Sequence, residues 1–201
     1  YINREGRRFL DRTWRFVDTI RASIETADTD ILDMDAERII GNLKDSDHYE
    51  ALSCGLVYED YNSWNSGRDL YNFSDTLLLE NVNSTDDYLA NPFYMISYRY
   101  LLVDDAKNGK GLYELRGSLS NRSLRLITAM QWDFLCGANE SYDASNPANT
   151  CGLISVGKES YRSNSYGFID LNGQFVSDGL CFRYVRDFTS DGVAIVQTQD
   201  E

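Results

Sequence analysis

The sequence predicts an α+β fold in which a long N-terminal amphipathic helix packs on antiparallel β-sheet. Two observations carry this prediction. Apolar residues recur at helical spacing through residues 1–33 and form one continuous stripe. From residue 93 onward the chain is dense in aromatic and β-branched residues, which turn-forming residues divide into short runs. Because the stripe of a helix and the inner face of a sheet each need a cover, packing one on the other buries both.

The predicted N-terminal helix is basic, whereas the rest of the chain is acidic. Residues 1–21 carry six arginines against three acidic residues, a net charge of +3 in a chain of net charge −13. The residues expected on its apolar face are Leu10, Trp14, Val17, Ile20, Ile24, Ala27 and Ile31. A short second helix is expected over residues 36–45, where Gly41 interrupts or ends it. We therefore predict a helical stem over residues 1–46 and a β-rich globular body over residues 47–201.

The body is expected to consist of short strands joined by hairpins. The ranges expected to form strands are 55–58, 95–103, 111–117 and 123–135, and the last three form an antiparallel meander. Asn108 and Gly109 supply the first hairpin turn, because Asn-Gly tolerates the left-handed backbone of tight turns. Two further hairpins are expected to turn at residues 171–173 and 189–192. No internal repeat of solenoid length is visible in the sequence.

Composition limits the classes of function. With 201 residues, of which 42% are hydrophobic, the chain is long enough to bury a full core. Its 32 acidic and 19 basic residues argue against nucleic acid as a partner, because phosphate binding needs a net basic face.

The four cysteines are widely spaced and form no C-x-x-C pair, so a zinc site is not expected. We predict two disulfides in an oxidising compartment. Three connectivities exist, and we favour Cys136 with Cys151, which closes a short polar loop, and Cys54 with Cys181. The alternative is four free thiols.

No catalytic residue, cofactor site or metal site is predicted. The one histidine, His48, is flanked by Asp45, Asp47 and Glu50, and we expect it to be exposed rather than catalytic. A looser calcium site is the only metal alternative, in an extracellular protein, drawn from Asp86, Asp87, Asp104, Asp105, Asp178 and Asp191. Aromatic residues interleaved with polar ones predict a contact loop that includes Tyr61, Trp64, Arg68 and Tyr71. Its alternative is a loop that folds its aromatic rings onto the sheet.

Two segments, REGRRFLDRTWRFVDTIRASI (residues 4–24) and ISYRYLLVDDAKNGKGLYELRG (residues 96–117), resemble the soluble part of type IV pilins and type II secretion pseudopilins, of the minor pilin W and pseudopilin J class. The resemblance implies a structural, noncatalytic subunit of a periplasmic or cell-surface filament, which acts in pilus assembly, adhesion or secretion. Its partners would be other pilin or pseudopilin subunits, and the apolar face from Leu10 to Ile31 would serve assembly by packing partly against them. Its membrane anchor would be a hydrophobic segment preceding Tyr1, because the chain opens inside a helix.

A second interpretation is an extracytoplasmic ligand-sensing domain of a membrane receptor. The segment SYGFIDLNGQFVSDG, residues 165–179, resembles the strand, turn and strand unit of Cache and PAS-like domains. In such receptors the last strand usually leads into a helix, whereas this sequence ends in the run VAIVQTQDE.

Overall fold

The structure is a computed structural model of the chain. It describes residues 16–17, 21–23, 29–33, 38–43, 49–59, 67–84, 91–136, 151–160 and 163–198, with side chains at residues 52 and 54–58 and in the later ranges. Contacts divide the chain into two compact units. The first comprises residues 1–82 and 116–123, and the second comprises residues 83–115 and 124–201.

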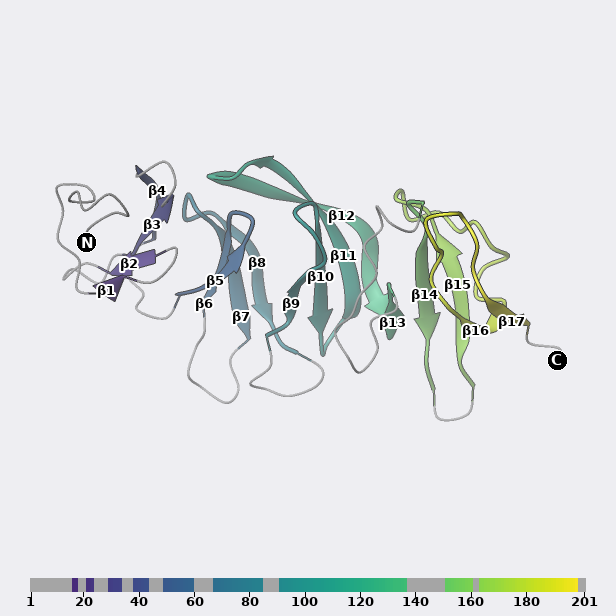
Figure 1. Cartoon of the computed structure of the whole chain (residues 1–201). Coiled ribbons are helices and arrows are strands. Elements are labelled where there is room, and N and C mark those ends of the chain that lie inside the picture. The colour runs from purple at the N-terminus through teal and green to yellow at the C-terminus, as the bar shows by residue number, and fades with distance from the viewer. Residues whose placement is uncertain are drawn as a thin grey trace. The chain divides into compact units, whose positions relative to one another are not determined.

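Every regular element in the described ranges is a β-strand (Figure 1). The strands form four sheets, and in each of them spatial neighbours follow one another along the chain. The described chain is therefore all-β, and the predicted α+β class is wrong. Within these same ranges, no helix is long and apolar enough to cross a membrane.

The first sheet occupies the range for which helices were predicted. Its strands are β1 (Phe16–Val17), β2 (Arg21–Ser23), β3 (Thr29–Asp33) and β4 (Arg38–Leu43). Where the structure describes the range of the predicted long helix, at residues 16–17, 21–23 and 29–33, it has three strands, and β4 lies within the range of the predicted short helix. The physical reason lies in residue type: the apolar stripe consists largely of valine and isoleucine, which lose side-chain freedom in a helix and favour a pleated strand.

The first unit also contains the second sheet, with β5 (Tyr49–Ser53), β6 (Leu56–Glu59), β7 (Arg68–Asn72) and β8 (Leu77–Val82). The strand predicted at residues 55–58 is confirmed as β6 with a shift of one residue. Cys54 and Gly55 join β5 to β6 with φ values of 54° and 89°, as a two-residue type I′ turn requires. The core of this sheet consists of Leu56, Val57, Leu70, Phe73 and Val82.

The second unit contains the third sheet, with β9 (Phe93–Met95), β10 (Tyr100–Asp105), β11 (Gly109–Ser118) and β12 (Asn121–Trp132). The hairpin predicted around Asn108 and Gly109 is confirmed, with its turn at residues 106–108 and Gly109 as the first residue of β11, paired with Asp105. The far end of the β11–β12 hairpin, residues 116–123, counts with the first unit.

The fourth sheet has β13 (Phe134–Leu135), β14 (Ile154–Lys158), β15 (Ser165–Ile169), β16 (Phe182–Val185) and β17 (Val196–Thr198). One side contributes Leu135, Ile154, Val156 and Ile169 to a core shared with Tyr100, Leu102, Leu112, Ile127 and Trp132 of the third sheet. Other residues of the fourth sheet, Phe134, Tyr166, Phe168 and Val185, form a separate cluster against which Phe182, Phe188 and Ala194 pack. The segment after β16 thus covers part of its own sheet.

A repeated plan connects these sheets. Each consists of four or five strands in chain order, and a Cys-Gly-Leu triplet opens the second strand of two of them. The triplets are Cys54 to Leu56 before β6 and Cys151 to Leu153 before β14, and the Cys and Gly of both have positive φ. Strand order, the Cys-Gly-Leu triplet and its turn geometry therefore repeat, although the sequence shows no repeat of solenoid length.

Candidate interaction surface

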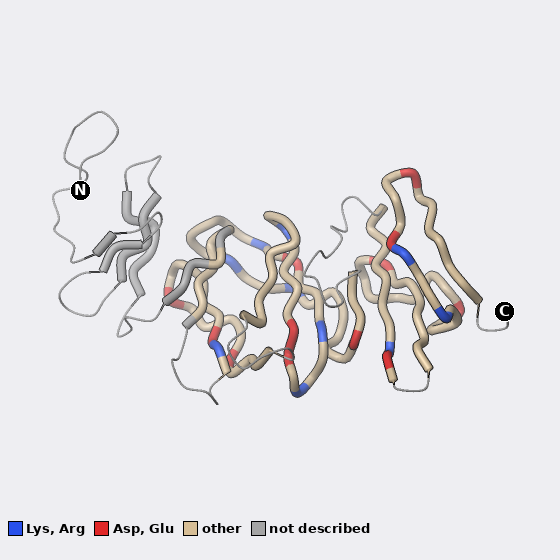
Figure 2. Tube along the Cα trace, turned by 60° about the horizontal axis from the view of Figure 1, so that its bottom comes forward, with Lys and Arg blue, Asp and Glu red and all other residues tan. Residues whose placement is uncertain are grey.

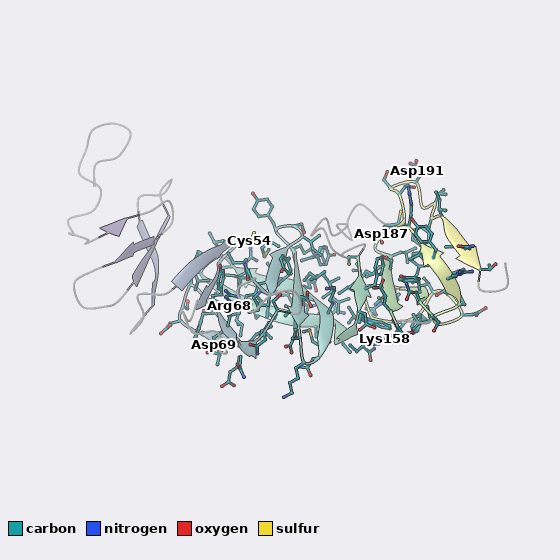
Figure 3. The ribbon with its side chains drawn as sticks, turned by 90° about the horizontal axis from the view of Figure 1, so that it is seen from below. Cys54, Arg68, Asp69, Lys158, Asp187 and Asp191 are labelled. Atoms are coloured by element: carbon teal, nitrogen blue, oxygen red, sulfur yellow. The ribbon has the colours of Figure 1, made fainter. Side chains whose placement is uncertain are left out.

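Among the described residues of the second unit, the last hairpin of the fourth sheet carries the most exposed aliphatic side chains, Val193 and Ile195. It runs from β16 through a turn at residues 189–192 into β17, and backbone bonds from Arg186 N to Ile195 O (2.8 Å) and from Thr189 N to Val193 O (2.9 Å) extend the pairing beyond the strands. Asp187 and Asp191 both lie on this hairpin, Asp191 at its turn (Figure 3). The turn predicted at residues 189–192 is thus confirmed.

Strand alternation places four residues on one side of this hairpin. Tyr184 pairs with Gln197, and Val185 pairs with Val196. Because side chains alternate along a strand, Tyr184 and Arg186 share a side with Ile195 and Gln197, opposite the buried Val185. All four are exposed, with 60% of Ile195 open to solvent. We call these four residues the outer face of the hairpin.

Electrostatics order the polar part of the outer face. Arg186 Nε donates a hydrogen bond to the Tyr184 hydroxyl at 2.9 Å. This hydrogen bond raises the pKa of Arg186 above its ordinary value, and the charge interaction with Tyr184 adds to the effect. The pair presents a cation and an aromatic ring next to Ile195. Such a combination of aromatic, Arg and aliphatic groups is typical of protein contact surfaces.

The same hairpin is anchored to the fourth sheet by a part-buried contact between Asp187 and Ser155 of β14. The Ser155 hydroxyl donates to Asp187 Oδ1, and Cys136 N donates to Ser155 O at 2.9 Å. Burial raises the pKa of the Cys136 thiol, and the negative charge of Asp187 raises it further. Burial also raises the pKa of Tyr166 to about 12, assisted by its hydrogen bond to Glu159. The Cys136 thiol and the Tyr166 hydroxyl are therefore neutral at physiological pH.

β17 is an edge strand. It pairs with β16 and ends the order of its sheet, and all three of its residues are exposed. Natural edge strands are usually guarded by Lys, Pro or a bulge. Here residues 192–199 carry no charge, and the irregularity lies on β16, between Phe182 and Tyr184. Among the described residues no strand pairs with the outer side of β17, so this edge offers its backbone groups to another strand.

A second polar cluster in this unit is a structural element. Glu114 of β11 is 7% exposed and accepts from Arg99 Nε at 2.9 Å and Nη2 at 2.6 Å, and from Arg125 Nη1 at 3.2 Å. Arg125 Nη2 also reaches the carbonyl oxygen of Leu171 at 3.4 Å. The carboxylate thus joins Arg99 of the segment between β9 and β10 to Arg125 of β12, and its charge is already neutralised.

Two of the four residues named for the predicted contact loop lie in the described part of the chain. Arg68 and Tyr71 lie within β7, where Arg68 is buried with its guanidinium over the Tyr58 ring at 5.8 Å, and Tyr71 is half-buried. Tyr61 and Trp64 lie outside the described residues. Of the predicted apolar face, Val17 lies in β1 and Ile31 in β3. The other five residues, Leu10, Trp14, Ile20, Ile24 and Ala27, lie outside the described residues.

The predicted disulfide residues lie in unlike environments. Cys136 is buried, Cys151 is exposed with Sγ 3.3 Å from Ser190 O, and Cys54 and Cys181 are half-buried. All four are thiols in the structure. Their two pairings stay predictions.

The acidic residues considered for calcium have other partners or stand apart. Asp104 pairs with Lys110 Nζ at 2.9 Å, and Asp105 accepts from Lys107 N and Asn108 Nδ2 in the hairpin turn. Asp178 and Asp191 are exposed, and Asp86 and Asp87 lie outside the described residues. In the part of the chain that is described, no three His, Cys, Asp or Glu side chains gather in a way that could hold a metal ion.

Comparison with known proteins assigns no family: no protein-family model matches the chain, and no curated protein matches it.

Sequence reasoning missed the outer face and the free edge. The signal was present in the uncharged run VAIVQT, residues 193–198, of a chain with net charge −13. We interpreted this run as the returning strand of a hairpin, which is correct for its pairing with β16. That it ends the sheet depends on the order of all five strands, which the run itself does not encode.

Proposed function

We propose that the chain is a noncatalytic binding scaffold of successive β-meanders that holds a polypeptide partner by strand addition at β17. The observation that carries this proposal is the free, uncharged edge of β17 beside the outer face. Strand addition uses main-chain hydrogen bonds for affinity and alternate side chains for specificity, and this edge supplies both.

The chemistry of the outer face selects the partner. Ile195 offers an aliphatic contact, the Tyr184 ring an aromatic one, and Arg186 a cation. A strand with aliphatic residues at every second position and a carboxylate opposite Arg186 would match this pattern. The chain as a whole is acidic, with a net charge of −13. Basic and acidic residues are nevertheless interspersed along the described strands (Figure 2), and Arg186 supplies a positive charge at this face.

Selection from a displayed library of ten-residue peptides on the protein, immobilised at low density, tests this proposal. We expect extended peptides with alternating aliphatic residues, and weaker binding to the Ile195→Lys variant. A matched control is Leu126→Lys, which changes an exposed leucine on β12 of the third sheet. Equal binding to both variants, or recovery of no peptide above background, would contradict the capture of peptides at β17.

The filament-subunit function and the receptor alternative remain predictions from sequence. The filament interpretation drew its main support from a long helix, and strands β1, β2 and β3 occupy that range. An assembly role through a sheet edge needs no helix, and for this reason we place the contact at β17.

A further inference from the structure

We propose that the partner strand is β17 of a second copy, paired antiparallel about a two-fold axis at Val196 so that two five-stranded sheets become one. This inference rests on the proposed function and names its partner. It follows from three features of the hairpin: the direction of its backbone groups, the register that they allow, and the local charge.

The direction of the backbone groups follows from the pairing with β16. Arg186 N donates to Ile195 O, so these residues form a hydrogen-bonded pair. In an antiparallel ladder such pairs alternate with non-hydrogen-bonded ones. Val196, which pairs with Val185, therefore directs its N–H and C=O away from β16. The same alternation directs the groups of Ala194 and Thr198 outward.

These outward groups match themselves in one register. A two-fold axis at Val196 sets Val196 opposite its own copy and Ala194 opposite Thr198, and both are hydrogen-bonded pairs. Ile195 then lies across from Gln197 of the second copy on the outer face. A two-fold contact of this kind is closed, because the same patch serves both copies.

Local charge permits the contact although the chain is acidic. The described part of the hairpin, residues 182–198, has two arginines and two aspartates, Arg183, Arg186, Asp187 and Asp191, which sum to zero. Each residue pair in the proposed register is uncharged. Two copies with a net charge of −13 each would therefore meet at a neutral edge, where like-charge repulsion is smallest.

A proline at the axis tests the pairing. Val196→Pro removes the outward N–H of both copies and leaves the ladder with β16 intact, since proline is tolerated on an edge strand where its N–H faces solvent. In sedimentation velocity we expect the mass of the wild-type chain to rise with concentration toward that of a dimer. Val196→Pro should weaken this association roughly tenfold or more, because two symmetric hydrogen bonds are lost. Its melting midpoint should stay within about 2 °C of the wild type.

Ile195→Pro is the contrasting variant. The Ile195 N–H faces β16, so losing this N–H should lower the melting midpoint.

Cross-linking checks the register independently. The Cα atoms of a hydrogen-bonded antiparallel pair lie about 5.5 Å apart, within reach of a disulfide. Val196→Cys should therefore give a covalent dimer under mild oxidation above the wild-type background, whereas Thr198→Cys, which lies away from the axis, should not.

The outcomes separate this inference from the proposed function. A wild-type chain that stays monomeric up to its solubility limit but captures displayed peptides would overturn self-pairing and leave strand addition standing. Dimerisation that Val196→Pro does not weaken, or equal cross-linking of both cysteine variants, would overturn the proposed register. Dimerisation without peptide capture would support self-pairing and restrict the proposed function to a second copy.

Discussion

Arg122 Nε donates a hydrogen bond to the carbonyl oxygen of Cys54 at 2.8 Å, across 68 positions of the chain. The same guanidinium donates from Nη1 to Gly117 O at 2.7 Å, and Asn72 Nδ2 donates to Arg122 O at 2.9 Å. Arg122 therefore ties the far end of the β11–β12 hairpin to the β5–β6 turn within the first unit. A planar fork of donors suits this task better than a flexible ammonium group.

We expect Arg122→Ala to destabilise the first unit by about 2 kcal/mol, because two charge-assisted hydrogen bonds to backbone carbonyls are lost at a half-exposed site. Arg122→Lys should recover less than half of the loss, since one ammonium cannot reproduce both directions. Urea unfolding followed by tyrosine and tryptophan fluorescence measures both variants. If alanine and wild type share one midpoint, the contact is not a stabilising one.

Gly55 lies at the same junction and tests its packing. Its φ is +89°, and a Cβ there would meet Leu119 O at 2.2 Å and Arg122 Cγ at 2.9 Å. Gly55→Ala should therefore cost more than the roughly 1–2 kcal/mol of a left-handed alanine. Gly179→Ala is the matched control, because φ is +68° and nothing lies within 4 Å of its Cβ. Equal losses in thermal unfolding would show that backbone strain alone acts at Gly55.

Sequence predicted the local turns of this fold better than its class. Gly109 supplies the left-handed backbone (φ 87°) that ends the turn, so the hairpin was predicted correctly although its tip lies at residues 106–108. The N-terminal stripe contains Val17 and Ile31, which lie in β1 and β3. Spacing there favoured a helix and residue type favoured a strand, and sheet pairing decided between them.

The candidate site depended on relationships that residue patterns do not contain. Glu114 is neutralised by Arg99, which lies between β9 and β10, and by Arg125 of β12, and nothing in the sequence distinguishes these arginines from the others. Likewise, the run from Val193 to Thr198 was recognised as a strand, but whether it was central or at an edge followed from the strand order. Short-range chemistry was thus readable, and long-range pairing was not.

Glu114 should contribute more stability than either of its arginines. Its side chain is 9% exposed, whereas that of Arg99 is 65% exposed. Glu114→Gln keeps the shape but removes the charge that two guanidinium groups face, so we expect a loss of about 2 kcal/mol. Arg99→Ala should cost about 0.5 kcal/mol, since exposed pairs are screened by water. Urea midpoints in the order wild type, Arg99→Ala, Glu114→Gln would agree, and the reverse order would not.

Asp170 should make the second unit sensitive to acid. Its carboxylate accepts from Gln174 N and Asn172 N at 2.9 and 2.8 Å, and these backbone hydrogen bonds, that from Gln174 first, lower its pKa. A lowered folded-state pKa means that the stabilisation is complete above the unfolded value, near 3.9, and is lost as pH falls through the folded value. Asp170→Asn should therefore be less stable than wild type at pH 7 and equal to it in stronger acid. A gap in urea midpoint that does not change with pH would exclude this role of the charge.

The cysteines offer two separate measurements. In the reduced native chain, the exposed Cys151 should react with a maleimide first and the buried Cys136 last, because burial raises the Cys136 pKa and thereby depletes its thiolate. Mass spectrometry of peptides after timed labelling gives this order, and Cys151→Ser removes the fast phase as a control.

Under denaturing, non-reducing conditions the predicted pairs, Cys136 with Cys151 and Cys54 with Cys181, should leave no thiol to label. Four reactive thiols in a chain isolated from an oxidising compartment would refute both pairings. The labelling order measured on the reduced chain would then also hold for the protein as isolated, because its thiols would already be free.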